Sequence, residues 1–180
     1  MHMRQASKSK KRISLLDMVS EAMTHNDIFH TINYRNKSED SIKQFVYPHL
    51  VDALAERMVE EKGISKDRAK EVVKRNLKWE GNVNTTVSHV LFMGTQNRPD
   101  MVLETDGLKI GIEFRKGESG SALRSGIGQS MIYSTHFDFV IYLFIDTTED
   151  KRIANSIGGT NETELIDLLW KDFNIKFVVK

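Results

Sequence analysis

Two runs of alternating residues flank an Asp106-Gly107 pair, and this pattern constrains the fold of the chain more than any other feature. The pair is a favoured two-residue loop of a β-hairpin, so residues equally far before and after it should lie opposite each other. Asp100, which follows Pro99, then lies opposite Glu113. Directly opposed side chains have Cβ atoms about 4.5 to 5.5 Å apart, where like charges repel. We therefore expect a divalent cation between the two carboxylates.

The same register divides the hairpin into two faces, because side chains alternate along a strand. The apolar face comprises Met101, Leu103, Leu108, Ile110, Ile112 and Phe114. The polar face comprises Asp100, Val102, Glu104, Lys109, Gly111, Glu113 and Arg115. One face should therefore pack in a core and the other should carry polar chemistry. Gly111 should leave open space beside the acids.

Composition excludes several classes of function. The chain has 180 residues, of which 39% are hydrophobic and 28% charged, as is typical of one soluble globular domain. It has no cysteine, so disulfides, thiolate metal sites and cysteine nucleophiles are excluded, and oxygen or imidazole must hold any metal. The sequence contains neither an apolar stretch long enough to span a membrane nor a signal-peptide core at its N-terminus. We expect a cytoplasmic protein with no membrane partner.

Basic residues cluster near the N-terminus, although the net charge of the chain is only +1. Residues 1–12 are predicted to form a flexible basic arm with Lys8, Lys10, Lys11 and Arg12. Such an arm can contact phosphate groups. It can equally be a solvated tail that aids solubility.

Periodicity and capping residues predict the remaining elements. Helices are expected at Ser14–Thr24, between the N-cap Ser38 and Gly63, and at Ser65–Leu77, Ser121–Ser134 and Glu162–Trp170. Strands are expected at Val83–Met93, Arg98–Thr105, Leu108–Arg115, Phe137–Ile145 and Ile175–Val179. Pro48 predicts a kink or two abutting helices near Tyr47. Gly126 and Gly128 indicate close packing of their helix on the sheet or on a ligand.

The order helix, three strands, helix, strand, taken with the two acids, resembles that of the PD-(D/E)xK nuclease superfamily. Two motifs lie on the hairpin: Pro99-Asp100, and Glu113 with Arg115 two positions later. The segment from Gln129 to Tyr133 matches the QxxxY element of exonuclease-type members. Glu39, followed by Phe45, Pro48 and Leu50, looks like the acidic motif of the first helix. Together they cover about residues 38–146. The resemblance implies an α/β fold with a restriction-endonuclease-like αβββαβ core, a mixed central sheet and additional N-terminal helices. Residues 13–180 would form one nuclease-like domain, with its core at about 38–146 and a helical insertion at about 63–80.

The resemblance also implies a function. The chain would be a Mg²⁺- or Mn²⁺-dependent nuclease that hydrolyses phosphodiester bonds, as a DNA endonuclease rather than an enzyme acting on RNA. Asp100, Glu113 and the Phe114 carbonyl would supply oxygen ligands to the ion, and Glu39 would help to bind a second one. A homodimer is plausible because cutting two strands needs two sites.

The basic position departs from the superfamily pattern, which usually has lysine where this chain has Arg115. Alternation points Arg115 toward the acids and Lys116 away, unless a bulge or the strand end turns Lys116 inward. Arginine can orient a water molecule or hold a phosphate but is a poor general base. Gln129 and Tyr133 share one helix face and would hold the nucleic-acid backbone or brace the basic residue.

Other interpretations stay open. The arginine favours a second hypothesis, a catalytically impaired nucleic-acid-binding module on the same fold, and a third is a protein-interaction domain. Considered one at a time, Asp100 and Glu113 are typical of solvated surface acids. Gln129 and Tyr133 are typical of half-buried packing residues. Glu39 is favourable at a helix start for its charge alone.

Overall fold

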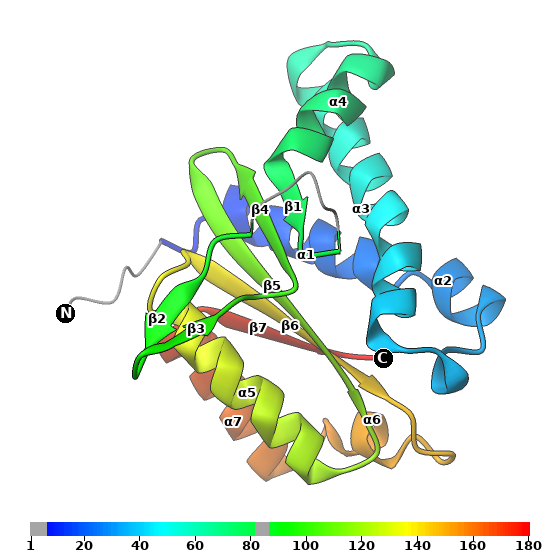
Figure 1. Cartoon of the computed structure of the whole chain (residues 1–180), viewed down its shortest axis with the longest axis vertical. Coiled ribbons are helices and arrows are strands. Elements are labelled where there is room, and N and C mark those ends of the chain that lie inside the picture. The colour runs from blue at the N-terminus through cyan, green and yellow to red at the C-terminus, as the bar shows by residue number, and fades with distance from the viewer. Residues whose placement is uncertain (1–6, 82–86) are drawn as a thin grey trace.

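A computed structural model of the chain describes residues 7–81 and 87–180, which form an α/β fold with helices on both sides of a sheet (Figure 1). The helices are α1 (Lys10–Met23), α2 (Asn26–Thr31), the 3₁₀ helix η1 (Tyr34–Asn36), α3 (Glu39–Lys62), α4 (Lys66–Asn76), α5 (Gly120–Ser134), α6 (Arg152–Ser156) and α7 (Thr160–Phe173). The strands are β1 (Leu77–Trp79), β2 (Val90–Phe92), β3 (Thr95–Asn97), β4 (Met101–Thr105), β5 (Leu108–Gly117), β6 (Phe139–Asp146) and β7 (Ile175–Val179).

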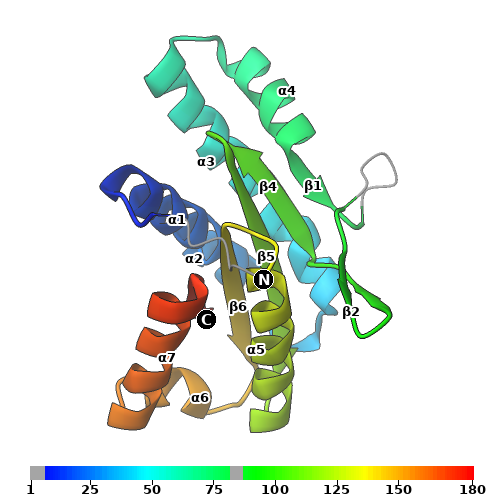
Figure 2. The same ribbon diagram turned by 90° about the vertical axis from the view of Figure 1, so that its left-hand side faces the viewer.

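The main sheet is mixed, as the sequence predicts, with the strand order β1-β4-β5-β6-β7. The β1–β4 and β4–β5 pairs are antiparallel, whereas the β5–β6 and β6–β7 pairs are parallel. Every residue of β6 is buried, which confirms the expectation that this apolar run is covered on both faces. Figures 1 and 2 show α1 and α3 against one face and α5 against the other.

The predicted hairpin is confirmed in register and in its apolar face. Met101 pairs with Ile112 and Thr105 with Leu108. Asp106 and Gly107 adopt φ values of 51° and 72°, the positive values that this class of turn needs at both central residues. The six residues of the apolar face lie in one buried cluster with residues of α1 and α3. The opposite face was expected to be polar but is not polar throughout, because Val102 lies in a second buried cluster with Tyr133 of α5 and Phe137 of the segment after it. The acids therefore lie beside a packed layer.

The first predicted strand, Val83–Met93, is confirmed only at Val90–Phe92, and it does not join the main sheet. Residues 83–86 lie outside the described part of the chain, and Val90–Phe92 forms a separate two-stranded sheet with β3. Met93 and Gly94 both have positive φ, so the chain turns back on itself there before it reaches the main sheet. The strand that joins the sheet beside β4 is β1, which directly follows α4 and falls at the end of the predicted helical insertion.

Pro48 does not divide its helix, because α3 is continuous from Glu39 to Lys62. Proline removes one N–H group and leaves the carbonyl four residues earlier, that of Gln44, without its helical donor. Pro48 and Gln44 are both exposed, so water can satisfy that carbonyl. The flanking buried residues Val46, Leu50 and Val51 hold both halves of the helix on the same core.

Two other local expectations are changed by the structure. Gly111 does not border open space, because a Cβ atom there would lie 3.2 Å from the ring of Phe137. Lys10, Lys11 and Arg12, which the sequence assigns to an N-terminal arm, form the first turn of α1, and residues 1–6 lie outside the described ranges. Among the residues that the structure describes, no helix has the length and apolar character needed to cross a membrane.

The two glycines of α5 differ in their surroundings. A Cβ atom at Gly126 would lie 2.2 Å from the hydroxyl oxygen of Tyr142, which donates to the Leu123 carbonyl at 3.1 Å. A Cβ atom at Gly128 would have no neighbour within 4 Å. The close packing predicted for this helix is therefore confirmed at Gly126 and not at Gly128.

We expect Gly126→Ala to lower the free energy of unfolding by about 1–3 kcal/mol, because the added methyl group must displace Tyr142 from β6. Gly128→Ala is the matched control and should raise it by up to about 1 kcal/mol, since alanine favours the helix. Urea unfolding of both variants measures the difference. Equal effects of the two substitutions would contradict the packing of α5 on β6.

Candidate functional site

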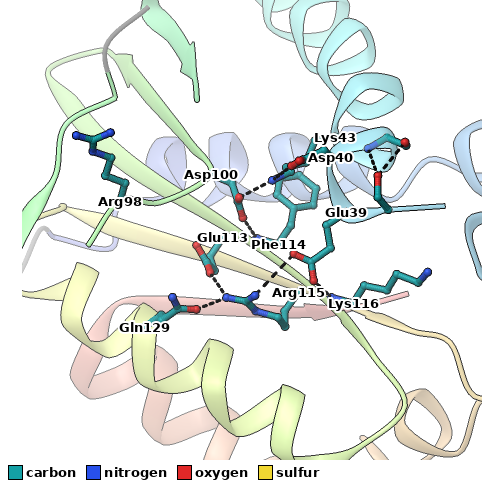
Figure 3. Close-up of polar contacts among 12 residues, drawn as sticks. Glu39, Asp40, Lys43, Arg98, Asp100, Glu113, Phe114, Arg115, Lys116 and Gln129 are labelled. Carbon is teal, nitrogen blue, oxygen red and sulfur yellow. Dashed lines mark hydrogen bonds and ion pairs between the residues drawn. The ribbon is translucent and has the colours of Figure 1, made fainter. Parts of the chain in front are cut away.

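Asp100 and Glu113 lie close together on the β4–β5 hairpin (Figure 3). Asp100 directly precedes β4, and the register that pairs Met101 with Ile112 places it beside Glu113 in β5. Glu113 is 3% exposed, and the side chain of Asp100 is 15% exposed. Oδ2 of Asp100 accepts the Phe114 N–H at 2.7 Å. The predicted opposition of two poorly solvated acids is therefore present.

Lys43 lies beside the acids, and sequence reasoning missed it. Its ammonium donates to Oδ1 of Asp100 and to Oδ1 of Asp40, each at 2.7 Å, and the residue is only 6% exposed. Burial opposes its charge, but the Asp100 and Asp40 carboxylates outweigh burial and raise the pKa of Lys43. A signal was available, because Lys43 lies one helical turn after Glu39 and therefore on the same face of α3.

Arg115 points toward the acids, as strand alternation predicts. Its Nη2 donates to Oε1 of Glu113 at 3.1 Å and to Oε1 of Gln129, and its Nη1 lies 3.8 Å from Oε2 of Glu39. Its Nε is buried without a hydrogen-bond partner. Three elements, α3, β5 and α5, thus fix one guanidinium group next to the acids.

Lys116 points away from the acids, so neither a bulge nor the strand end turns it inward. Its ammonium donates to the backbone carbonyls of Arg35 and Lys37, which lie in and just after η1. Its side chain is therefore engaged outside the candidate site. Only its backbone contributes to the site, because the Lys116 N–H donates to Oε1 of Glu39 at 2.9 Å.

Glu39, the first residue of α3, reaches the cluster as predicted. Ser38 caps the helix by accepting the Ser41 N–H at 3.1 Å, which sets the start of α3 over the end of β5. One oxygen of Glu39 accepts the Lys116 N–H and the other faces Arg115. These contacts are those of a residue that positions Arg115, and its role in binding a second ion stays a prediction.

Gln129 and Tyr133 of α5 have different roles, although they share a helix face. Gln129 accepts from Arg115 and so braces the basic residue. Tyr133 is 1% exposed and donates its hydroxyl to the Arg98 carbonyl at 2.7 Å, so it is not available to hold a nucleic-acid backbone. Burial, together with the Glu113 and Asp100 carboxylates, raises the pKa of Tyr133, which keeps the hydroxyl protonated as a donor. It positions the segment that leads into Asp100.

The electrostatic balance of the site leaves Glu113 poorly compensated. Burial, followed by the Asp100 carboxylate, raises the pKa of the Glu113 carboxyl group to about 8. Arg115 lowers this pKa, Glu39 raises it, and Lys43 lowers it. Two acids, Asp100 and Glu39, therefore oppose the ionised form of Glu113, and two cations, Arg115 and Lys43, favour it.

The donor groups match a small hard cation in kind. Because the N–H and C=O groups of one strand residue point to the same side, the Phe114 carbonyl lies on the side of its N–H, toward Asp100. Within residues 7–81 and 87–180, no group of three histidine, cysteine, aspartate or glutamate side chains is arranged to hold a metal. The chain thus offers two carboxylates and one carbonyl. Mg²⁺ is commonly bound through one or two carboxylates, with waters and substrate oxygens completing its shell.

Comparison of the chain with protein-family models, with curated proteins and with solved structures found no match.

Proposed function

We propose that this chain is a metal-dependent nuclease with a restriction-endonuclease-like core, and that it hydrolyses phosphodiester bonds as a DNA endonuclease. One observation carries the proposal: Asp100 and Glu113 lie side by side across a hairpin, with Arg115 fixed next to them by Glu39 and Gln129. If α4 and the separate β2–β3 hairpin are left out, the elements α3, β1, β4, β5, α5 and β6 follow the order αβββαβ, which supports the restriction-endonuclease-like core. The preference for DNA rests on the resemblance to the PD-(D/E)xK superfamily.

The residues of the site suit this chemistry. Asp100, Glu113 and the Phe114 carbonyl would hold a Mg²⁺ or Mn²⁺ ion, which would supply Lewis-acid activation of the phosphodiester and of the attacking water. Arg115 donates to phosphate oxygens and offsets the charge that develops on them. Neither Arg115 nor Lys43 accepts a proton at neutral pH, because the guanidinium stays charged and the pKa of Lys43 is raised. Both cations therefore orient groups and balance charge.

The contacts of Lys43 and Arg115 also favour a second candidate function. Each acid is already bonded to a cation of the chain, Asp100 to Lys43 and Glu113 to Arg115, and the usual lysine after the glutamate is replaced by arginine. A nucleic-acid-binding module that does not cleave is consistent with this arrangement.

Cleavage and binding assays separate these functions. Purified protein is incubated with supercoiled plasmid, linear duplex, single-stranded DNA and RNA, with and without Mg²⁺ or Mn²⁺. Metal-dependent cleavage supports the nuclease. Salt-sensitive binding without cleavage under either metal overturns it in favour of the binding module. Loss of both activities favours a protein-interaction domain.

Arg115→Ala is expected to lower the cleavage rate about 10²–10³-fold, as removal of a single charge-stabilising donor does in other active sites. Lys116→Ala is the matched control, because its ammonium is bound to the Arg35 and Lys37 carbonyls, and it should change the rate less than about threefold. Single-turnover cleavage of a plasmid measures both rates. A larger loss in the Lys116 variant would assign the basic role to Lys116 instead.

A further inference from the structure

The β2–β3 hairpin presents three consecutive large apolar side chains at its tip. Leu91, Phe92 and Met93 are 67%, 47% and 88% exposed. Figure 2 shows the hairpin projecting beyond the main sheet. Single exposed apolar residues are common on proteins, but a contiguous exposed group marks an interaction site.

The base of the hairpin is fixed to the candidate site. Val87 and Val90 are buried in one cluster with Tyr133 and Phe137. Tyr133 donates to the Arg98 carbonyl, two residues before Asp100. The seven residues from Met93 at the tip to Asp100 span at most about 25 Å. The apolar tip therefore lies within about 25 Å of Asp100, less than one turn of a nucleic-acid duplex.

The charge of the surrounding surface favours a polyanionic partner. The chain has 25 acidic residues, yet none lies in 87–99, which contains the hairpin, or in 119–137, which contains α5. These two segments pack against each other (Figures 1 and 2). Both carry an exposed arginine, Arg124 in α5 and Arg98, whose guanidinium lies 3.9 Å from the Glu80 carboxylate. Two neighbouring segments that lack carboxylates repel phosphate groups little, and Arg124, which has no carboxylate in its own segment, attracts them.

We propose that the tip of the β2–β3 hairpin inserts between base pairs of a duplex whose backbone lies along α5 and whose phosphodiester reaches Asp100 and Glu113. Proteins that kink a duplex insert phenylalanine, leucine or methionine between base steps in this way. The tip is too small to form a stable protein interface alone, which needs about 1,000 Å² of buried surface. This inference rests on the proposed function and deepens it, because it names a duplex as the substrate and a kinked state as its bound form.

The test uses Phe92→Ala with Met93→Ala, made in a Glu113→Gln background so that binding is measured without cleavage. The probe is a fluorescein-labelled DNA duplex that carries 2-aminopurine, whose fluorescence rises when the base unstacks. We expect the double substitution to weaken binding about tenfold and to abolish the fluorescence rise. The matched control is Leu165→Ala with Leu168→Ala in the same background, because these α7 residues are 44% and 46% exposed on another element and should leave both readouts unchanged.

Three results overturn the hairpin proposal: unchanged affinity and fluorescence in the tip variant, an equal loss in the α7 control, or conversion of a dimer to a monomer by the tip substitutions in sedimentation velocity. Absence of duplex binding by the Glu113→Gln protein also overturns it. The proposed nuclease activity is tested separately, and absence of metal-dependent cleavage by the unsubstituted chain would overturn it. Duplex binding through the tip could still be observed in that case, without catalysis.

Discussion

Glu113→Gln is expected to stabilise the metal-free protein at pH 7 by on the order of 3 kcal/mol. The Glu113 carboxyl group keeps its proton in the folded state up to about pH 8, whereas its ordinary pKa is 4.5. The folded state therefore binds more protons than the unfolded state between these values, so the stability of the parent falls as the pH rises through this window. Glutamine does not titrate, so the stability of the Glu113→Gln variant should not fall in this window. Urea unfolding in EDTA at pH 5 and pH 7 measures the effect, which should be small at pH 5.

Divalent cations should make the parent protein more stable than the Glu113→Gln variant, which reverses the order expected without metal. An ion that binds only the folded state stabilises the parent by an amount that grows with its concentration, whereas the glutamine variant lacks one carboxylate ligand and should gain little. Thermal unfolding with increasing Mn²⁺ measures both proteins. A parent whose stability does not fall between pH 5 and pH 7 would contradict the electrostatic account of Glu113. An equal response of the two proteins to Mn²⁺ would contradict its role as a ligand.

Lys43→Met is expected to lower the free energy of unfolding by about 3 kcal/mol. The Lys43 ammonium is bonded to Asp100 at 2.7 Å and is almost fully buried. Its removal leaves the Asp100 carboxylate poorly solvated next to Glu113, and an uncompensated buried charge is costly. Urea unfolding at neutral pH in EDTA gives the difference between parent and variant.

Asp40→Asn is the matched control for this prediction, because Asp40 bonds to the same ammonium at the same distance but has a side chain that is 80% exposed. Exposed ion pairs contribute little, so the change should stay within about 0.5 kcal/mol. Adding Asp100→Asn to Lys43→Met should recover part of the loss, since no unpaired carboxylate then remains. Equal losses in the Lys43 and Asp40 variants would show that burial does not set the energetics of this pair.

The parts of the fold that depend on local chemistry were predictable from the sequence. Asp106 and Gly107 define the turn, and the turn alone fixes the register that brings Asp100 opposite Glu113. Ser38 caps α3, and Gly63 ends that helix in the left-handed conformation at φ 64°. Each of these signals acts between residues a few positions apart, so one sequence suffices to detect it.

The parts that were missed depend on contacts between distant segments. Lys43 meets Asp100 only because α3 packs across the sheet, and Phe137 fills the space beside Gly111 only because the chain returns after α5. β1 has three residues, too few to show alternation, and it becomes a strand by pairing with β4. Neither hydrophobic periodicity nor turn chemistry carries this information.

The central question is whether Asp100 and Glu113 share one divalent cation. Isothermal titration calorimetry answers it, with Mn²⁺ added to the metal-free protein in the presence and in the absence of a DNA duplex. We expect the parent to bind one ion per chain at these acids, and we expect this binding to be lost in Asp100→Asn and in Glu113→Gln and retained in Lys116→Ala. Absence of ion binding by the parent even with the duplex present, or unchanged binding in both acid variants, would contradict this expectation.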